Sequence, residues 1–561
     1  MERASGAEIV VRLLERQGIR IIPGIPGGAN LPLYDALSRS AVIRHVLARH
    51  EQGAGFIAQG MARVTGQPQV FWATSGPGAT NTLTALADAR LDSVPLICIT
   101  GQVPSAMIGT DAFQEVDIYG MSLPVTKHNF LVRSAAELLT VIPAAFRIAA
   151  SGRPGPVLID IPKDVQTQVA SFAAWPAPGR PDPLPALDPD ALARAAALIN
   201  AAERPLLYLG GGAARSGAAR AARELADGAT IPAAMTLMGL GALPATHPLC
   251  LGMLGMHAAP CTNILLEECD LLVAVGVRFD DRATGKLDQF CPRARVVHID
   301  IDPGEMDKLR TPEVGITADA AQALDALLPL VERRDRAPWA GRVARLRASH
   351  GFEPPYADDP ASAYGVIAHV ARLLGEDGVV CTDVGQHQMR TAQAYPFARP
   401  GRLLTSGGLG TMGFGVPAAI GAALARPDLP VACFSGDGSI LMNIQELATA
   451  VEQGANVKIV LLDNNALGLV QQQQQLFYGG RIFGSDYRMR PDFTAIARGF
   501  GMRAFDLSTG VAPAQTLAMA FAERGPCLIR VPVPAAEGVY PMVPPGAANR
   551  EMIGDAAHVR P

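Results

Sequence analysis

One pattern of strand, glycine turn, helix and strand occurs in both the first and the last third of the chain. The two segments are VFWATSGPGATNTLTALADARLDSVPLICITG and VACFSGDGSILMNIQELATAVEQGANVKIVLLDNN. Each begins with an apolar strand that runs into S-G-x-G, and a helical stretch and a second apolar strand follow, which predicts a parallel β-α-β unit. Ser75-Gly76 and Ser435-Gly436 occupy matching positions. The match indicates two domains of related fold, although such a unit is common enough to recur by chance.

The length of the chain and two linker-like stretches within it indicate three domains. At about 150 residues per domain, 561 residues correspond to three or four. A stretch rich in Pro and Asp at 170–190 and a charged, Arg-rich stretch at 331–360 predict linkers. Short β-branched runs alternate with longer helical stretches, so we expect the α/β class, with three doubly wound parallel-sheet domains. We place the domains and a C-terminal tail at residues 1–168, 190–330, 361–535 and 536–561.

The composition excludes several classes of function. The chain has 48 Lys and Arg against 52 Asp and Glu, a net charge of −4, which argues against a nucleic-acid-binding surface beyond a local patch. No apolar run approaches the roughly 18 residues of a membrane span, and the first residues predict an amphipathic helix rather than a signal peptide. The eight cysteines form no CxxC pair, which is typical of reduced core thiols. We expect a cytoplasmic protein that binds neither membranes nor nucleic acid.

The strongest chemical signal is Gly436-Asp437-Gly438, followed further along the chain by Asn464. Asp437 ends one apolar strand and Asn464 ends the next, and ligands bind at the carboxyl ends of parallel strands. The helix that begins after the glycines directs free N–H groups at the same place, which suits a diphosphate. Carboxylate, amide and phosphate oxygens suit octahedral Mg²⁺. A plain glycine turn is the alternative, and the spaced Asn makes it the weaker one.

Three further signals each have two interpretations. Glu51, in RHEQGA, is either a charge in the first turn of a helix or a partly desolvated carboxylate that exchanges a proton with a ring nitrogen. The cluster Arg278-Phe279-Asp280-Asp281-Arg282 is either a solvated surface turn or a grip on a dinucleotide. His257, in GMLGMH, is either a core histidine or a ligand contact. The residues alone leave these alternatives open.

Together these residues resemble the thiamine-diphosphate enzyme family, and within it the catalytic subunits of acetohydroxyacid synthase, also called acetolactate synthase. GDG followed by Asn resembles the diphosphate and Mg²⁺ motif, and RHEQGA resembles the segment of the activating glutamate. The similarity extends over nearly the whole chain, through GIPGGANLPLYDAL, TSGPGATN, DAFQEVD, KHN, GRPGPVLIDIPKDVQ, GMLGMH, RFDDR, DVGQHQM, TSGGLGTMGFG, SGDGS and QLFY. VYPMVPPGAAN and the glutamine run resemble the bacterial isozyme I branch in particular.

The resemblance implies residues for thiamine diphosphate and Mg²⁺. Glu51 would hydrogen-bond the aminopyrimidine and promote its imino form, and Met412 would hold the cofactor in a bent shape. Asp437, Asn464 and the backbone oxygen of Ala466 would hold Mg²⁺. Further cofactor contacts are implied for Gly24, Gln386, His387, Gly410, Gly436, Gly438 and Ser439.

The resemblance also implies FAD, as a structural group rather than a redox participant, and sites for two substrates. Phe113, Gln114 and Lys163 match positions near the substrate and the entrance. Arg278 matches the arginine that binds the carboxylate of the second 2-oxoacid and contacts FAD. Other positions at the flavin match Arg153, Gly211, Gly212, Met256, His257, Gly276, Asp280, Arg282, Asp300 and Asp319.

The implied reaction is decarboxylation of pyruvate and transfer of the hydroxyethyl unit to a second pyruvate or to 2-oxobutyrate. The products are 2-acetolactate or 2-aceto-2-hydroxybutyrate, the first common step of branched-chain amino-acid biosynthesis. The resemblance assigns the pyrimidine to 1–168, FAD to 190–330 and the diphosphate to 361–535, and implies a homodimer or tetramer with the site between subunits and a separate small regulatory subunit. The alternative is an FAD-dependent oxidoreductase of the pyruvate oxidase type, against which RFDDR and DAFQEVD argue.

Three residues depart from the family pattern. Gln473 stands where many relatives have Trp, whose ring favours 2-oxobutyrate as second substrate. One such contact is worth about 1–3 kcal/mol, so we expect little preference for 2-oxobutyrate. Asp463 stands where the paired asparagine of the family begins, and the retained Asn464 predicts that Mg²⁺ still binds. Arg390 stands where relatives usually have Trp, and the sequence offers no physical account of it.

Overall fold

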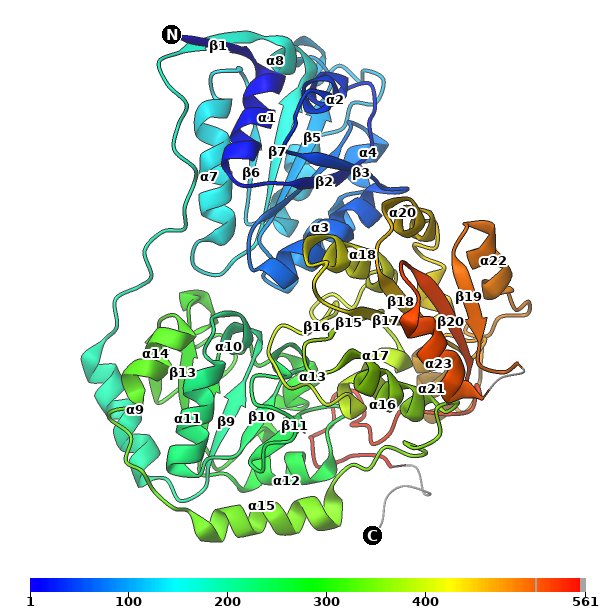
Figure 1. The fold of residues 1–561 in the computed structure, drawn as a ribbon. Helices are drawn as coiled ribbons and strands as arrows, with labels where there is room; N and C mark the ends of the chain where they lie inside the picture. The colour runs from blue at the N-terminus through cyan, green and yellow to red at the C-terminus, as the bar shows by residue number, and fades with distance from the viewer. Residues whose placement is uncertain (510–511, 555–561) are drawn as a thin grey trace.

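The computed structural model describes residues 1–509 and 512–554, and it contains three six-stranded sheets with helices packed on them (Figure 1). Every strand pair within these three sheets is parallel. The predicted fold class, three parallel-sheet α/β domains, is confirmed. The predicted C-terminal tail extends beyond the described residues, because 555–561 lie outside them.

The N-terminal and C-terminal sheets have the same topology. Numbered in chain order within each sheet, the strands lie side by side in the order 2-1-3-4-6-5 in both. The N-terminal strands are β2 (Ile21–Gly24), β3 (Arg44–Leu47), β4 (Gln69–Ala73), β5 (Leu96–Gln102), β6 (His128–Leu131) and β7 (Pro156–Pro162). The C-terminal strands are β15 (Val379–Thr382), β16 (Leu403–Leu404), β17 (Val431–Gly436), β18 (Val457–Asp463), β19 (Arg503–Asp506) and β20 (Cys527–Pro532). The two outer domains therefore share a fold, as the repeated unit predicts.

The central sheet has a different strand order. Its strands lie in the order 3-2-1-4-5-6, which is the order of dinucleotide-binding α/β folds. They are β9 (Pro205–Leu209), β10 (Ala233–Met235), β11 (Cys250–Met253), β12 (Leu271–Val275), β13 (Arg295–Asp300) and β14 (Val314–Thr317). The sequence of β12, LLVAV, is buried throughout, as expected for a central strand covered on both faces.

Helices fill the connections between the parallel strands. The N-terminal domain contains α1 (Gly6–Arg16), α2 (Leu31–Ser38), α3 (Glu51–Thr65), α5 (Leu83–Leu91) and α7 (Leu138–Ala150). The central domain contains α9 (Pro189–Ala201), α10 (Gly211–Arg215), α11 (Ala219–Ala229), α12 (Pro260–Glu268) and α14 (Ala320–Leu327). The C-terminal domain contains α16 (Ala363–Leu374), α17 (Gln386–Ala394), α18 (Gly415–Ala425), α20 (Glu446–Gln453), α21 (Gly468–Phe477), α22 (Phe493–Gly499) and α23 (Pro513–Ala522).

One helix from each outer domain contributes to the contact between them. Helices α3 and α18 each follow the second strand of their sheet in the chain, and they pack side by side (Figure 1). A Cβ on Gly60 would lie 2.0 Å from a carbonyl oxygen of α18, and a Cβ on Gly421 would lie 1.9 Å from a carbonyl oxygen of α3. Only glycine fits at these two positions, so the helices approach backbone to backbone.

The two stretches predicted as linkers differ in the structure. After β8 (Val169–Phe172), which pairs with β1 (Glu2–Ser5), the chain runs without helix or strand to α9 (Figure 1). The expectation of a linker over 331–360 is partly wrong, because α15 (Ala337–His350) forms there. Its charged sequence carries an apolar face, and that face packs against α12 through Trp339, Val343 and Leu346.

Other expectations from the composition hold. All eight cysteines are buried and unpaired, as expected for core thiols. The predicted amphipathic helix at the start of the chain is α1, which Ser5 caps through a capping box with Glu8. Over residues 1–509 and 512–554 no helix has the length and apolar character that a membrane span requires.

Candidate active site

A cavity of about 240 Å³ lies at the carboxyl ends of β17 and β18 in the C-terminal domain. β17 leads directly into α19 (Asp437–Ile440), and Asn464 follows β18. Because the two strands are parallel neighbours, their ends meet at one edge of the sheet. The predicted cofactor positions that line this smaller cavity are Gln386, His387, Gly410, Met412, Gly436, Asp437, Gly438, Ser439, Asn464 and Ala466.

The predicted Mg²⁺ ligands converge on one backbone amide. The N–H of Ala466 donates to the carboxylate of Asp437 at 3.1 Å and to the side-chain oxygen of Asn464 at 3.2 Å. Burial raises the pKa of Asp437 to about 6, and the charge of the neighbouring Asp463 adds to the effect. Its hydrogen-bond donors are backbone amides, among them that of Gly438 at 3.0 Å. A buried carboxylate neutralised only by amide dipoles fits a divalent cation held by oxygen ligands.

Few charged side chains are placed to bind a metal ion at this site. No group of three or more His, Cys, Asp and Glu placed to hold a metal ion occurs in the part of the chain that the structure describes. A metal bound at Asp437 would therefore have one carboxylate from the protein, with neutral oxygens from Asn464 and Ala466. Mg²⁺ is commonly held in this way, by one or two carboxylates together with the phosphates of a ligand and water.

Helix α17 presents two polar side chains to the smaller cavity. Burial lowers the pKa of His387 to about 3, with the charge of Arg390 adding to the effect, so the ring is neutral. Its buried Nε2 has no hydrogen-bond partner among the described residues. The Nδ2 of Asn464 donates to the side-chain oxygen of Gln386 at 3.2 Å. A buried, unpartnered nitrogen on a residue that lines the cavity fits a polar ligand.

A larger cavity, of about 560 Å³, lies at the carboxyl edge of the central sheet. The strand order there and the glycine turn at the start of α10 match dinucleotide-binding folds. Gly410 and Gln473 also line this cavity, so the C-terminal domain closes one side of it. The predicted FAD positions all line it, namely Arg153, Gly211, Gly212, Met256, His257, Gly276, Arg278, Asp280, Arg282, Asp300 and Asp319.

Four arginines line the larger cavity, together with five acidic residues. The guanidinium of Arg153 donates to the hydroxyl of Ser93 at 2.9 Å, and that of Arg278 donates to the carbonyl oxygen of Leu91 at 2.9 Å. The bond of Arg278 joins the central domain to the N-terminal one, and residues of the C-terminal domain line the same cavity, so all three domains meet there. Sequence reasoning missed Arg215, whose place just after the GGG turn was the available signal. The arginines that line the cavity are Arg153, Arg215, Arg278 and Arg282.

Two titratable groups at the larger cavity have pKa values shifted by burial. The pKa of His257 is lowered to about 4, and its neutral ring donates from Nδ1 to the carbonyl oxygen of Pro541 at 3.1 Å. Burial raises the pKa of Asp300 to about 6. His257 is thus both a buried histidine and a cavity-lining one, so the two interpretations of this residue do not exclude each other.

Of the residues predicted in the N-terminal domain, Arg153 lines the larger cavity, whereas Glu51, Phe113, Gln114 and Lys163 lie elsewhere. Glu51 begins α3 and is 8% exposed, and the Nδ2 of Asn81 donates to its carboxylate at 2.9 Å. Phe113, Gln114 and Lys163 belong to the same domain, and Phe113 is 87% exposed. None of the four predicted residues lines either of the two cavities described above. The structure therefore does not bring Glu51 to the Mg²⁺ motif within one chain.

The start of α3 instead contacts the outer side of the C-terminal domain. The N–H groups of Arg49 and His50 donate to the carboxylate of Glu446, in α20, at 2.9 and 3.0 Å. Gly24 ends β2 and also lines neither of the two cavities. A Cβ on Gly78 would lie 3.3 Å from the carboxylate of Glu51, so the S-G-x-G turn of this domain lies beside the glutamate.

The three departures from the family pattern have different surroundings. Asp463 is wholly buried and pairs with Arg530 at 2.6 Å. Arg390 lines the smaller cavity and donates to the carbonyl oxygen of Glu537 at 2.8 Å, so it ties the segment after β20 to α17. Gln473 is exposed and lines the larger cavity. The structure thus supplies the account of Arg390 that the sequence lacks.

Comparison with known proteins identifies the family. Models of the thiamine pyrophosphate enzyme N-terminal, central and C-terminal domains match residues 4–121, 192–327 and 383–531. The chain is 58% identical to the acetolactate synthase isozyme 1 large subunit of Escherichia coli K12, over 99% of this chain and 98% of the relative. It is 47% identical to the isozyme 2 large subunit of that organism, over 98% and 99%, and 44% identical to the acetolactate synthase large subunit of Corynebacterium glutamicum, over 98% and 90%. As its motifs predict, the chain belongs to the thiamine pyrophosphate enzymes and, within them, to the family of acetolactate synthase large subunits.

Proposed function

We propose that this chain decarboxylates pyruvate and transfers the two-carbon unit to a second 2-oxoacid, giving 2-acetolactate from two pyruvates. The observation that carries the proposal is that the side chains of Asp437 and Asn464 both accept the N–H of Ala466 at the strand ends, in a chain of this family. The relatives compared above are acetolactate synthases, which favours this reaction over the pyruvate oxidase alternative.

The smaller cavity would hold the diphosphate and Mg²⁺. Asp437 would contribute the carboxylate, and Asn464 and Ala466 two neutral oxygens. His387 would contact the diphosphate, since it lines the smaller cavity and its buried Nε2 has no hydrogen-bond partner among the described residues. When bound, thiamine diphosphate takes up the electron pair that loss of carbon dioxide leaves on the substrate carbon. The chain's own part is to hold the charged end of the cofactor and to exclude water.

A second copy of the chain would supply Glu51. Its carboxylate would exchange a proton with a ring nitrogen of the cofactor, which requires hydrogen-bond distance. Because Glu51 lines neither cavity in its own chain, a symmetric dimer would bring it to the smaller cavity of its partner, giving two equivalent sites. Leu441 and Met442, which directly follow α19, are 37% and 53% exposed and would be covered in such a dimer.

The larger cavity would hold FAD and the second substrate. Four arginines and the dinucleotide-binding strand order suit the diphosphate of FAD. Arg278 would bind the carboxylate of the second 2-oxoacid. Gln473 lines the same cavity without an aromatic face, so equal amounts of pyruvate and 2-oxobutyrate would give mainly 2-acetolactate. A competition assay with a strong 2-oxobutyrate preference would contradict this part of the proposal.

A small regulatory subunit would complete the assembly. The relatives are named large subunits, which supports a smaller partner for this chain as well.

The decisive experiment is identification of the product. The purified full chain would be incubated with pyruvate, Mg²⁺, thiamine diphosphate and FAD, and acetolactate and oxygen consumption would be measured together. Acetolactate without matching oxygen consumption is the expected result. Peroxide with acetate or acetyl phosphate would instead establish the oxidase reaction.

A further inference from the structure

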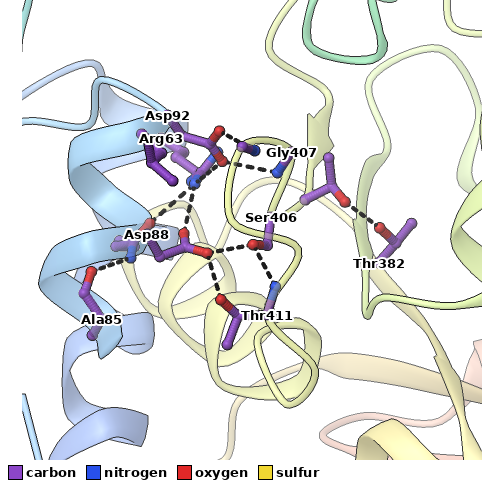
Figure 2. Close-up of polar contacts among 12 residues, drawn as sticks. Arg63, Ala85, Asp88, Asp92, Thr382, Ser406, Gly407 and Thr411 are labelled. Carbon is purple, nitrogen blue, oxygen red and sulfur yellow. Dashed lines mark hydrogen bonds and ion pairs between the residues drawn. The ribbon is translucent and has the colours of Figure 1, made fainter. Parts of the chain in front are cut away.

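Two acidic side chains of the N-terminal domain are buried against a loop of the C-terminal domain (Figure 2). Asp88, in α5, is wholly buried, and Asp92, directly after this helix, is 3% exposed. They face residues 405–412, which follow β16 and which we call the wall loop. Neither acid belongs to the residues predicted for the reaction, and carboxylates are rarely buried without a specific role.

Asp88 binds two hydroxyl groups of the wall loop. Its carboxylate accepts hydrogen bonds from Ser406 and from Thr411, the latter at 3.0 Å (Figure 2). The hydroxyl of Ser406 also accepts the backbone N–H of Thr411 at 2.8 Å, which closes the loop into a ring. Burial and the neighbouring charge of Asp92 raise the pKa of Asp88 above its usual range. The position of both loop ends is thus set by one carboxylate.

The carboxylate of Asp92 binds backbone N–H groups at the tip of the wall loop. Each of its two oxygens accepts one N–H, from Gly407 at 3.0 Å and from Gly408 at 2.8 Å. Arg63, in α3, pairs with Asp92 at 2.9 Å and with Asp88 at 3.4 Å, and so links the two acids (Figure 2). Two buried carboxylates share one guanidinium here. Buried carboxylates depend on the groups that pair them, so displacement of the wall loop would leave both acids short of partners.

The wall loop separates the two cavities of the candidate site. Ser406, Gly407 and Gly410 line the larger cavity, and Gly410 and Met412 line the smaller one. Asp92 itself also lines the larger cavity. The loop and the acid that holds it are thus within reach of an occupant of the larger cavity, and Met412 at the end of the same loop lines the smaller cavity.

We propose that Asp88 and Asp92 are positioning residues that, through the wall loop, couple occupancy of the larger cavity to the shape of the smaller cavity. The inference rests on the proposed function, because it takes FAD and thiamine diphosphate as the two occupants. We take this coupling to be favourable; because coupling between two sites is reciprocal, each cofactor would then strengthen the binding of the other by the same factor. Through the hydrogen bonds of Asp88 and Asp92 to the wall loop, FAD would affect the reaction without any electron transfer.

The test measures, in the full-length protein, the factor by which thiamine diphosphate and Mg²⁺ change the affinity for FAD. The Kd for FAD is measured by flavin fluorescence without thiamine diphosphate and with saturating thiamine diphosphate and Mg²⁺. We expect FAD to bind the unaltered protein at least about 5-fold more tightly in the second condition. Thr411→Val removes one donor to Asp88 at nearly constant volume, and Thr411 lines neither cavity. This variant should lower the factor below about 2-fold, whereas Thr411→Ser should retain it.

Asp160→Asn is the matched control. Asp160 is a buried carboxylate of the same domain that contacts neither cavity, and its substitution should leave the factor unchanged. The inference is overturned if Thr411→Val keeps the factor, if Thr411→Ser or Asp160→Asn loses it equally, or if the unaltered protein binds both cofactors independently. Failure of the unaltered protein to bind either cofactor would instead overturn the proposed function, and the inference with it.

Discussion

The N-terminal and C-terminal domains share one topology but carry different chemistry at the carboxyl edges of their sheets. In the C-terminal domain, Asp437 and Asn464 meet at one amide beside a cavity. In the N-terminal domain, the acid is Glu51, which begins α3 and is hydrogen-bonded by Asn81. Under the proposed function, the same fold would present oxygen ligands for a cation in the C-terminal domain and a single carboxylate for proton exchange in the N-terminal domain. Function resides in what is placed at the strand ends, not in the fold itself.

The two domains also meet through equivalent helices. α3 and α18 hold the same place in their folds, and each contributes one glycine at the crossing. This contact places Glu51 away from Asp437 in its own chain. A complete site therefore needs the N-terminal edge of one chain and the C-terminal edge of another, as proposed above.

The largest expected effects distinguish the roles of the two acids. Glu51→Gln should lower the rate by about 10²–10⁴-fold while thiamine diphosphate and Mg²⁺ still bind, because only a proton exchange is removed. Asp437→Asn should abolish binding of both, because the one carboxylate of the predicted Mg²⁺ site is gone. Steady-state rates and cofactor titrations of both variants make the distinction. Near-normal activity of the Glu51→Gln variant would refute the role of that residue.

Combining the same two variants tests where the site is assembled. Both chains would be co-expressed with different tags, and dimers that carry both tags would be isolated. If each site uses Glu51 from one chain and Asp437 from the other, one of the two sites is intact, and about half of the normal activity should appear. A site contained within one chain would leave these mixed dimers inactive. Dimers of a single variant, purified in the same way, give the baseline.

A smaller effect is expected at the contact between the two domains. Gly421→Ala should lower the free energy of unfolding by about 1–3 kcal/mol, because the new Cβ would collide with the backbone of α3. Gly228→Ala, in α11, is the control, because a Cβ there meets no atom within 4 Å. That substitution should stabilise the chain by up to about 1 kcal/mol. Thermal unfolding at one scan rate compares the variants, and equal stability would show that α3 and α18 can separate without cost.

The smallest expected effect depends on pH and on Asp160, within β7. Burial raises its pKa to about 7, so the folded chain favours the protonated acid. Its stabilising contribution is therefore present below its usual pKa and is lost as the pH rises through about 7. Asn cannot ionise, so the unfolding temperature of Asp160→Asn relative to the unaltered chain should increase by about 2–4 °C between pH 5 and pH 8.

The control for that measurement is an exposed acid of the same domain. Asp35 has a side chain that is 71% exposed, and Asp35→Asn should show no comparable trend with pH. An Asp160→Asn variant whose relative stability stays constant or falls from pH 5 to pH 8 would contradict the raised pKa.

Strand-end reasoning predicted that Asp437 and Asn464 meet at one edge of the C-terminal sheet, as they do, and their role in binding Mg²⁺ stays a prediction. Asp437 and Asn464 each end an apolar strand, and the parallel order of β17 and β18 brings them together. The prediction depended on local patterns and one general rule of α/β folds. The gathering of the predicted FAD positions at one cavity came from family resemblance, and their individual roles stay predictions.

Other parts could not be predicted, because they depend on distant segments. In LADARLD, the sequence of Asp88 and Asp92 is that of an ordinary helix with solvated acids. Their burial arises from the wall loop, which lies more than three hundred residues further along the chain, as the separation of 318 residues between Asp88 and Ser406 shows. The charged stretch around Trp339 likewise became a helix only because α12 offers an apolar surface.

The sequence by itself determined the α/β class, the related outer domains and the polar residues at the strand ends. These follow from hydrophobic periodicity, glycine turns and the rule that parallel strands end at one edge, all of which act over short stretches. Only the tertiary structure decided that Glu51 lies apart from Asp437, that one loop forms a wall of both cavities, and that Asp88 and Asp92 are buried against it. Those features depend on which surfaces of distant segments pack together, and no local pattern specifies that choice.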